Sequence, residues 1–326
     1  MYDIAKNLTV LLVVVAHSTR MYTDYGTFSP ANSSPLLAAV TEYIYQFHMP
    51  LFIFLSGAVY AFCINGGKYA DNVAFVKSKA KRLLIPYFIV GFLYVVPVMY
   101  ALGLVGDNML NYCYWGILLS WNAVHLWFLE ALFWIFLFAM AVKKILILPS
   151  KRRLLLLPIS AAIFCLKRYV PDIFQLRSAC AYQLYFVIGI LFHFNYEMIE
   201  RFFGRFYRFG VALPVVLLGM FWFNPNKISD MLYTFIGMTA LGALAMYIAG
   251  YKRQILNTVW YQTIKRNAMG IYLFHPMIIY ILYYFLGPRN IHPLVLSSSI
   301  AIVSIYVSVF LTRLIRMLHL QVLIGE

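Results

Sequence analysis

The chain has 326 residues, of which 63% are apolar and 11% are charged, and its formal net charge is +15. Soluble globular domains contain about 45–50% apolar and about 25% charged residues. The composition therefore excludes a soluble enzyme, a disordered chain and a nucleic-acid-binding domain of ordinary make-up, and it predicts a protein that lies largely in lipid.

Apolar segments of span length recur along the whole chain, and at about 20 residues per span they supply roughly ten helices. No hydrophilic stretch between them is long enough for a soluble domain. The fifth segment is short, contains Pro158 and is interrupted by basic residues. We therefore predict an all-α, polytopic membrane protein with a single domain over residues 1–326. The expected spans are 4–20, 43–63, 83–103, 125–142, 145–166, 179–195, 209–224, 231–250, 268–287 and 294–315.

The basic residues are distributed unevenly between the two sides of this arrangement. With the N-terminus in the cytoplasm, 20 of the 26 Lys and Arg residues fall on the cytoplasmic side. Cytoplasmic loops of membrane proteins carry such an excess of Lys and Arg. Most of the positive charge is thus explained by topology rather than by a nucleic-acid partner, and both ends of the chain are predicted to be cytoplasmic.

The cysteines form no pattern that binds a metal. They make no C-x-x-C pair and no Cys/His cluster of metal-ligand spacing, so we expect no metal site and no structural disulfide. The four are Cys63, Cys113, Cys165 and Cys180.

Polar side chains inside spans are costly, which makes each one a candidate functional residue. His17 lies in the first expected span, and the eleven steps from Lys6 to His17 cover about 16 Å of helix. With Lys6 at the inner surface, His17 lies near the middle or in the outer half of the membrane. A neutral imidazole there can take a proton from a hydroxyl group. The alternative is a histidine that forms a hydrogen bond across a helix interface.

The second span combines a histidine with two features that disturb a straight helix. His48 is followed by Pro50, which removes a backbone donor, and by Ser56-Gly57, which allows another helix to approach closely. A kinked helix beside a histidine can line a cavity. An interfacial histidine beside a packing kink is the alternative.

Four further residues are candidates in the fourth and ninth spans. His125 lies at the outer end of the fourth span, with Glu130 about one and a half turns deeper, where a carboxyl group needs a partner or a proton. Trp127 between them is either part of a site or an anchor at the membrane interface. His275 precedes Pro276 and is expected in the inner half of the ninth span.

A basic cluster precedes the third span, ending in Arg82-Leu83-Leu84-Ile85-Pro86-Tyr87. Basic side chains gathered on the cytoplasmic side can hold phosphate groups. The alternative is a signal that orients the chain or a contact with anionic lipid. The cluster consists of Lys77, Lys79, Lys81 and Arg82.

Together these segments resemble the integral-membrane acyltransferase-3 family, and within it the branch similar to fucose 4-O-acetylases. The matches occur in the family's order and are spread over most of the chain. One departure is Asn7, which stands where the family commonly has a Gly. The matching segments are Asp3-x-x-Lys6-x10-His17, Phe47-His48-Met49-Pro50-Leu51-Phe52-Ile53-Phe54-Leu55-Ser56-Gly57, the basic cluster with Arg82-Leu83-Leu84-Ile85-Pro86-Tyr87, Leu126-Trp127-Phe128-Leu129, and Tyr272-Leu273-Phe274-His275-Pro276.

The resemblance implies a multi-pass enzyme of the bacterial inner membrane. It would transfer an acetyl group from cytoplasmic acetyl-CoA to a hydroxyl of a sugar, polysaccharide or glycolipid, without a metal. His17 is then the general base or a transient acetyl carrier, assisted by Asp3 and Lys6, and the basic cluster holds the CoA phosphates. The candidates for acceptor binding or proton handling are His48, Ser56, His125, Trp127, Glu130 and His275.

Two other classes of protein fit the same composition. A carrier or flippase for a glycan or anionic substrate also has polar groups in its spans, and it would move its substrate without acetyl-CoA turnover. A receptor or scaffold would bind no CoA and would leave the histidines unexplained. The identity of the acceptor, the acyl chain length and the oligomeric state are left open by the sequence.

Overall fold

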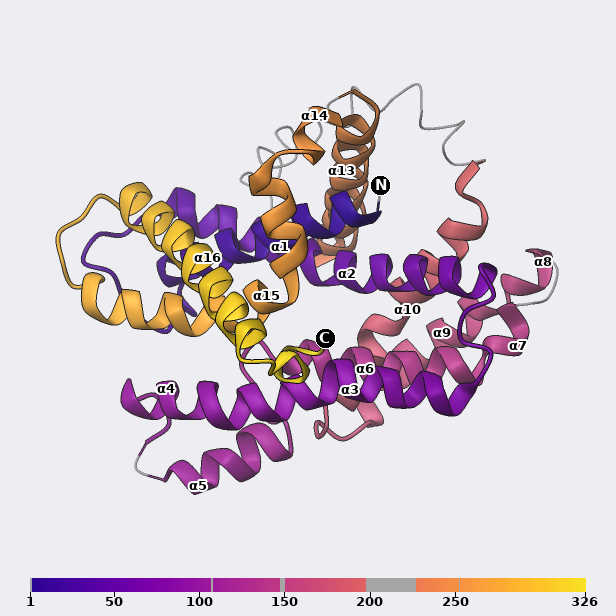
Figure 1. Cartoon of the computed structure of the whole chain (residues 1–326), viewed down its shortest axis with the longest axis horizontal. Coiled ribbons are helices and arrows are strands. Elements are labelled where there is room, and N and C mark those ends of the chain that lie inside the picture. Colours follow the sequence, from indigo (N-terminus) through magenta and orange to yellow (C-terminus); the bar gives the residue numbers. More distant parts are fainter. Residues whose placement is uncertain (1, 107, 147–149, 198–226, 252) are drawn as a thin grey trace. The chain divides into compact units, whose positions relative to one another are not determined.

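A computed structural model describes residues 2–106, 108–146, 150–197, 227–251 and 253–326, and the described residues form helices and connecting loops without a strand (Figure 1). They divide into two compact units. Unit 1 consists of the described residues up to Phe52 and those from Glu197 to Leu314, and unit 2 consists of Ile53–Tyr196 and Ile315–Glu326.

Unit 1 combines the first part of the chain with most of its last part. Its elements are α1 (Tyr2–Thr19), η1 (Arg20–Tyr22), the first part of α2 (Pro35–Asn65), α13 (Lys227–Tyr251), α14 (Arg253–Leu256), α15 (Val259–Leu286) and most of α16 (Pro293–Met317).

Unit 2 contains the rest of α2 and the middle of the chain. Its other elements are α3 (Asn72–Val90), the π-helix η2 (Gly91–Val95), α4 (Val96–Ala101), α5 (Met109–Asn111), the π-helix η3 (Tyr112–Leu118), α6 (Trp127–Ala141), α7 (Lys143–Leu146), α8 (Ser150–Arg153), α9 (Leu156–Leu166), η4 (Lys167–Tyr169), α10 (Leu176–Phe194) and η5 (Gln321–Ile324).

Four of the described helices are long and apolar enough to cross a membrane, and shorter apolar helices accompany them at Trp127–Ala141 and Thr234–Gly250. The chain is thus an all-α protein, in the part described, with several membrane-spanning helices, whereas the count of ten spans stays a prediction. The expected span 209–224 lies outside the described residues. The four long helices are Pro35–Asn65, Asn72–Ala101, Val259–Leu286 and Pro293–Met317.

Two expected segments differ from the observed helices. Segment 145–166 is divided into α7, α8 and α9, with Pro158 in the first turn of α9, where its missing N–H removes no helix bond. Residues 109–118, which the sequence left between spans, are helical, and the Asn108 side chain accepts the Asn111 N–H at the start of this stretch. Side-chain capping explains a helix that hydropathy alone does not indicate.

In unit 1, α1 packs against α13 and α15. The Tyr283 hydroxyl of α15 donates to the Ser18 carbonyl at 2.5 Å, and the hydroxyls of Thr41 and Thr19 join α2 to the end of α1 at 2.6 Å. Gly270 lies so close to Thr312 of α16 that a Cβ would overlap its Oγ1. Hydroxyl groups and a small residue thus hold these helices together, as is common where lipid removes the hydrophobic drive for helix association.

In unit 2, α2 and α10 cross at a pair of glycines. A Cβ on Gly57 would lie 2.0 Å from the Phe186 carbonyl oxygen, and a Cβ on Gly189 would lie 2.0 Å from the Phe54 carbonyl oxygen. The close helix approach that Ser56-Gly57 predicts is therefore confirmed, and its partner is α10. Ser160 of α9 and Gln183 of α10 exchange two hydrogen bonds beside this crossing.

Candidate active site

Three helices of unit 1 bring the candidate base together with two aromatic neighbours. His17 of α1 lies edge-on to His275 of α15, with ring centroids 5.1 Å apart and an interplanar angle of 84°. Tyr45 of α2 lies 5.9 Å from His17 and 4.9 Å from His48. Three histidines that are separated widely in the sequence thus form one cluster with Tyr45, and we call these four residues the histidine cluster.

The two supporting histidines are held in defined orientations by their own helices. The ring Nδ1 of His275 lies 2.6 Å from the Ile271 carbonyl, and that of His48 lies 2.8 Å from the Ile44 carbonyl. A carbonyl oxygen only accepts, so in both neutral rings Nδ1 carries the proton and Nε2 carries the lone pair. Both rings are buried, whereas His17 is only partly so.

The helix that carries His275 begins earlier than the sequence predicts. It begins at Val259, where the Thr258 side chain caps it through the Tyr261 N–H, instead of at 268. His275 therefore lies near the middle of α15, and its depth in the membrane stays a prediction. The first turns of α15 contain polar residues, so hydropathy alone does not indicate where the helix begins.

The proline after His48 has a partner that compensates for its missing donor. Pro50 cannot donate to the Gln46 carbonyl, and the Thr234 hydroxyl of α13 donates to that carbonyl at 2.9 Å instead. Phe47 packs closely on Gly237, one turn further along α13. The helix α2 therefore passes the proline without an unsatisfied carbonyl, and His48 keeps its place in the cluster.

Arg20 and Tyr45 belong to this site although the sequence did not single them out. Arg20 follows α1 directly, donates to the Tyr25 carbonyl at 3.5 Å and lies 5.7 Å from the centre of the Tyr25 ring. The Tyr25 ring in turn contacts the Tyr45 ring, with centroids 6.3 Å apart. Burial raises the pKa of the Tyr25 hydroxyl, and the neighbouring Glu42 raises it further. The spacing of Tyr45 and His48, three residues apart on one helix, was a signal that could have found Tyr45.

The acidic and basic residues at the start of α1 lie away from the histidine cluster along the helix. Asp3 forms an ion pair with Lys265 of α15 at 2.7 Å, and its side chain is 63% exposed. Lys6 is exposed, and the helix rise places it about 16 Å from the level of His17. The structure therefore brings neither residue to the ring of His17.

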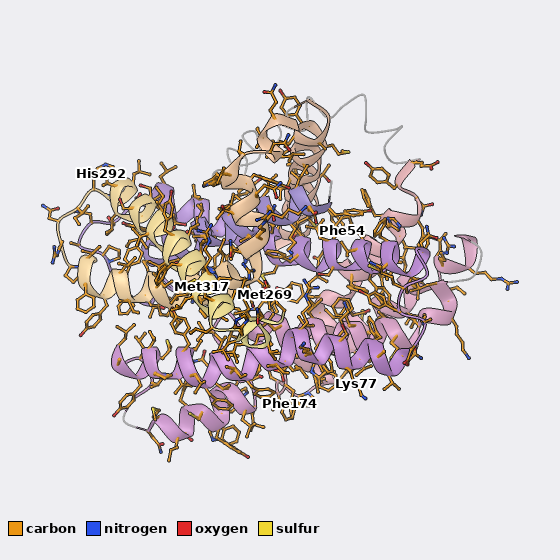
Figure 2. The ribbon with its side chains drawn as sticks, in the orientation of Figure 1. Phe54, Lys77, Phe174, Met269, His292 and Met317 are labelled. Carbon is orange, nitrogen blue, oxygen red and sulfur yellow. The ribbon has the colours of Figure 1, made fainter. Side chains whose placement is uncertain are left out.

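The basic cluster in α3 separates into two environments. The Lys79 ammonium lies 4.0 Å from the centre of the Phe136 ring, 5.0 Å from that of Tyr69 and 5.4 Å from that of Phe75. Burial raises the pKa of the Tyr69 hydroxyl, which lies in the loop before α3, to about 12. Lys79 is thus surrounded by aromatic rings, while three others are exposed and form no ion pair within the described part of the chain. These are Lys77, which lies on α3 in Figure 2, Lys81 and Arg82.

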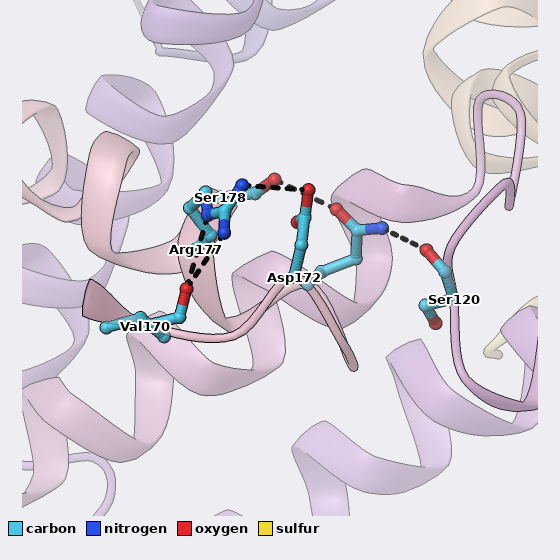
Figure 3. Close-up of polar contacts among 6 residues, drawn as sticks. Ser120, Val170, Asp172, Arg177 and Ser178 are labelled. Atoms are coloured by element: carbon cyan, nitrogen blue, oxygen red, sulfur yellow. Dashed lines mark hydrogen bonds and ion pairs between the residues drawn. The ribbon is translucent and has the colours of Figure 1, made fainter. Parts of the chain in front are cut away.

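A second polar cluster lies in unit 2 around the buried carboxyl of Glu130. Ser120 donates to Glu130 and contacts the Tyr87 hydroxyl, which donates to the Ile117 carbonyl at 2.6 Å. Gln175 donates to the Ser120 carbonyl at 2.5 Å, the contact at the right of Figure 3. Ser120 has φ +60°, so these contacts hold a backbone that L-residues rarely adopt. The carboxyl thus has a hydroxyl partner in Ser120, as its position in an apolar helix demands.

The remaining candidates also lie in unit 2. His125 is buried just before α6, Trp127 lies 5.4 Å from Tyr182 ring to ring, and Ser56 is half-buried beside the glycine crossing. No group of three His, Cys, Asp or Glu side chains suited to a metal occurs among the residues that the structure covers.

Ionisable residues inside apolar helices mark a functional site, and histidine is the side chain that most often transfers protons in catalysis. A family model described as an acyltransferase domain, acyltransferase-3, matches residues 2–313, and the chain belongs to this family. It is thus a membrane acyltransferase. Comparison with curated proteins and with solved structures gives no match.

Proposed function

We propose that the protein is an O-acetyltransferase that moves an acetyl group from cytoplasmic acetyl-CoA to a hydroxyl of a sugar, polysaccharide or glycolipid. The observation that carries the proposal is the contact of His17 with His275, because it gives the partly accessible imidazole a buried neighbour with a fixed tautomer. A base that is oriented by a second polar group is the recurring arrangement in acyl transfer.

Two reaction routes use this geometry. In the first, His17 takes the proton of the acceptor hydroxyl while its oxygen attacks the acetyl carbonyl, and the CoA sulfur leaves with that proton. In the second, His17 attacks the carbonyl, CoA leaves as the thiol, and the acceptor oxygen then displaces the imidazole while losing its proton. In both routes His275 acts as a positioning residue, because its Nδ1 is held by the Ile271 carbonyl and its ring lies edge-on to that of His17.

We assign the donor phosphates to the exposed cations of α3. Arg82, Lys77 and Lys81 are exposed without an ion-pair partner in the described residues, which suits the multiply charged CoA. Lys79 is assigned a supporting role, because its aromatic neighbours already surround its charge. Ten spans with both ends in the cytoplasm would place this cluster on the side where acetyl-CoA occurs.

The proposal is tested with the full chain in lipid nanodiscs, radiolabelled acetyl-CoA and a mixed envelope glycan as acceptor. His17→Ala and His17→Gln should abolish transfer. A melting temperature equal to that of the wild type establishes that both variants are folded. The matched control is His292→Ala, which removes an exposed histidine from the α15–α16 loop (Figure 2) and should retain transfer.

The same assay separates the two routes and the competing class of protein. Acid trapping of a labelled enzyme before acceptor is added indicates an acetyl-histidine, whereas a ternary complex without label indicates a general base. Transfer that persists in His17→Ala would refute the role of His17. Substrate movement across the bilayer without acetyl-CoA consumption would indicate a carrier instead.

A further inference from the structure

Arg20 is an arginine at the histidine cluster that lacks a carboxylate partner. It is half-buried, and its Nε is shielded from solvent and has no hydrogen-bond partner within the described residues. The ion pairs found in the described part of the chain do not include it. Asp24 and Glu42 are both exposed nearby in sequence or space, yet neither pairs with it. A guanidinium presents a planar fork that matches carboxylate and phosphate oxygens, and here it donates to the Tyr25 carbonyl but forms no ion pair with a carboxylate of the described residues.

Tyr45 connects Arg20 to the candidate base. The Arg20 guanidinium lies 5.7 Å from the centre of the Tyr25 ring, and Tyr25 contacts the Tyr45 ring at 6.3 Å between centres. The Tyr45 ring in turn lies 5.9 Å from that of His17. His17 and Arg20 are also three residues apart across the end of α1, a spacing that places side chains on the same face. An oxyanion bound by Arg20 would therefore lie beside the hydroxyl that reacts at His17.

The chain segment that follows Arg20 is held in place by contacts with the end of α15 and the loop after it. The Ala31 N–H donates to the Gly287 carbonyl at 2.8 Å, and the Tyr22 hydroxyl donates to the Pro293 carbonyl at 3.2 Å. Thr27 donates to the Tyr280 hydroxyl at 3.0 Å. A cation on such a pinned segment is preorganised, so little ordering opposes the binding of an anion.

Aromatic rings on the segment that follows Arg20 and on α15 supply flat apolar surface, and one of them, Tyr25, lies against the Arg20 guanidinium. Tyr25 contacts Tyr45 at 6.3 Å between ring centres, and Phe28 contacts Tyr280 and Tyr284 at 5.9 and 6.1 Å. Tyr25 and Tyr284 are exposed. Rings that carry a hydroxyl and expose one face suit a ligand with both apolar and polar sides, such as a sugar.

From these observations, and resting on the proposed function, we infer that the acceptor is an anionic glycan whose carboxylate or phosphate is bound by Arg20 next to the hydroxyl that receives the acetyl group. The bound oxyanion stays unchanged in the reaction, and its role is to place the neighbouring hydroxyl at His17. Arg20 is therefore a specificity-determining residue for the acceptor.

The test uses three acceptors that differ only at C6 of the sugar: methyl β-glucoside, methyl β-glucuronide and methyl β-glucoside 6-phosphate. With the wild-type chain in nanodiscs, kcat/KM for acetyl transfer should be about 10- to 100-fold higher for a charged glycoside than for the neutral one. The better of the two charged glycosides identifies the carboxylate or the phosphate as the natural group. Each glycoside is also tested as a competitive inhibitor of transfer to a mixed envelope glycan. The inhibition constants then rank the binding of the three glycosides even if one of them binds without reacting.

Arg20→Gln should remove this preference through KM for the charged glycosides, and Arg20→Lys should restore part of it because the charge is kept. The matched control is Arg289→Gln, which removes an exposed arginine from the α15–α16 loop and should keep the preference. Equal use of the three glycosides, no rank among them as competitors, or a loss in Arg20→Gln that is the same for all three overturns the inference. If the wild-type chain shows no acetyl-CoA turnover that depends on His17, the proposed function itself is refuted.

Discussion

The glycine crossing of α2 and α10 allows a quantitative prediction about stability. In Gly57→Ala the new methyl group would lie 2.0 Å from the Phe186 carbonyl oxygen, whereas ordinary contact begins at 3.4 Å, so a gap of about 1.4 Å must open. A gap of that size removes a quarter to a half or more of the local contact energy between packed atoms. Overpacking of this kind costs about 1–3 kcal/mol, which alanine's better helix propensity offsets by at most about 1 kcal/mol.

The net cost is then about 1 kcal/mol, so we expect Gly57→Ala to lower the melting temperature of the detergent-solubilised chain by about 2–4 °C, the shift that this free energy produces in a chain above 150 residues. Gly189→Ala should act alike, because its Cβ would meet the Phe54 carbonyl at the same distance. The double variant should lose less than the sum, since the first methyl group already separates the two backbones.

The control is Gly242→Ala in α13, where an added methyl group would meet no atom within 4 Å. It should leave the melting temperature unchanged or raise it slightly, because alanine favours the helix. Melting is followed by fluorescence-detected size exclusion after heating. If Gly57→Ala melts together with the wild type, or if the double variant shows the full sum of the two losses, the close crossing is not the reason for these glycines.

Two further predictions concern the site residues. His275→Phe keeps the volume of the buried ring and removes its lone pair, so kcat of acetyl transfer should fall about 10- to 100-fold, as for other positioning groups, with an unchanged KM for acetyl-CoA; an unchanged kcat would contradict the role of His275. Arg82→Gln should raise KM for acetyl-CoA about tenfold with little change in the melting temperature, because it removes a phosphate ligand. Lys79→Met should instead lower the melting temperature, because it removes cation–π contacts worth about 1–2 kcal/mol, and it should change KM less. The opposite pattern would reverse the assignment of these two cations.

The sequence by itself determined the class of protein and the family. Composition excluded a soluble chain, and the helices observed at the expected apolar segments follow from the length of apolar run that lipid demands. The motif around His17, the segment ending in Ser56-Gly57 and the segment at His275 were sufficient to place the chain in acyltransferase-3, and the family match confirms this. Each of these features lies within a short stretch of the chain, and it can therefore be recognised without a structure.

The tertiary structure decided which of the candidates meet. His17 contacts His275 across 258 positions of sequence, and Tyr45 links His17 to His48. The Lys79 ammonium lies among aromatic rings, while Arg82 stays exposed. A helix that is apolar on nearly all sides carries no polar face to indicate which side turns inward. Its rotation and its neighbours are set by glycine contacts, hydroxyl bonds and ring packing between distant segments, and these depend on geometry that hydropathy does not encode.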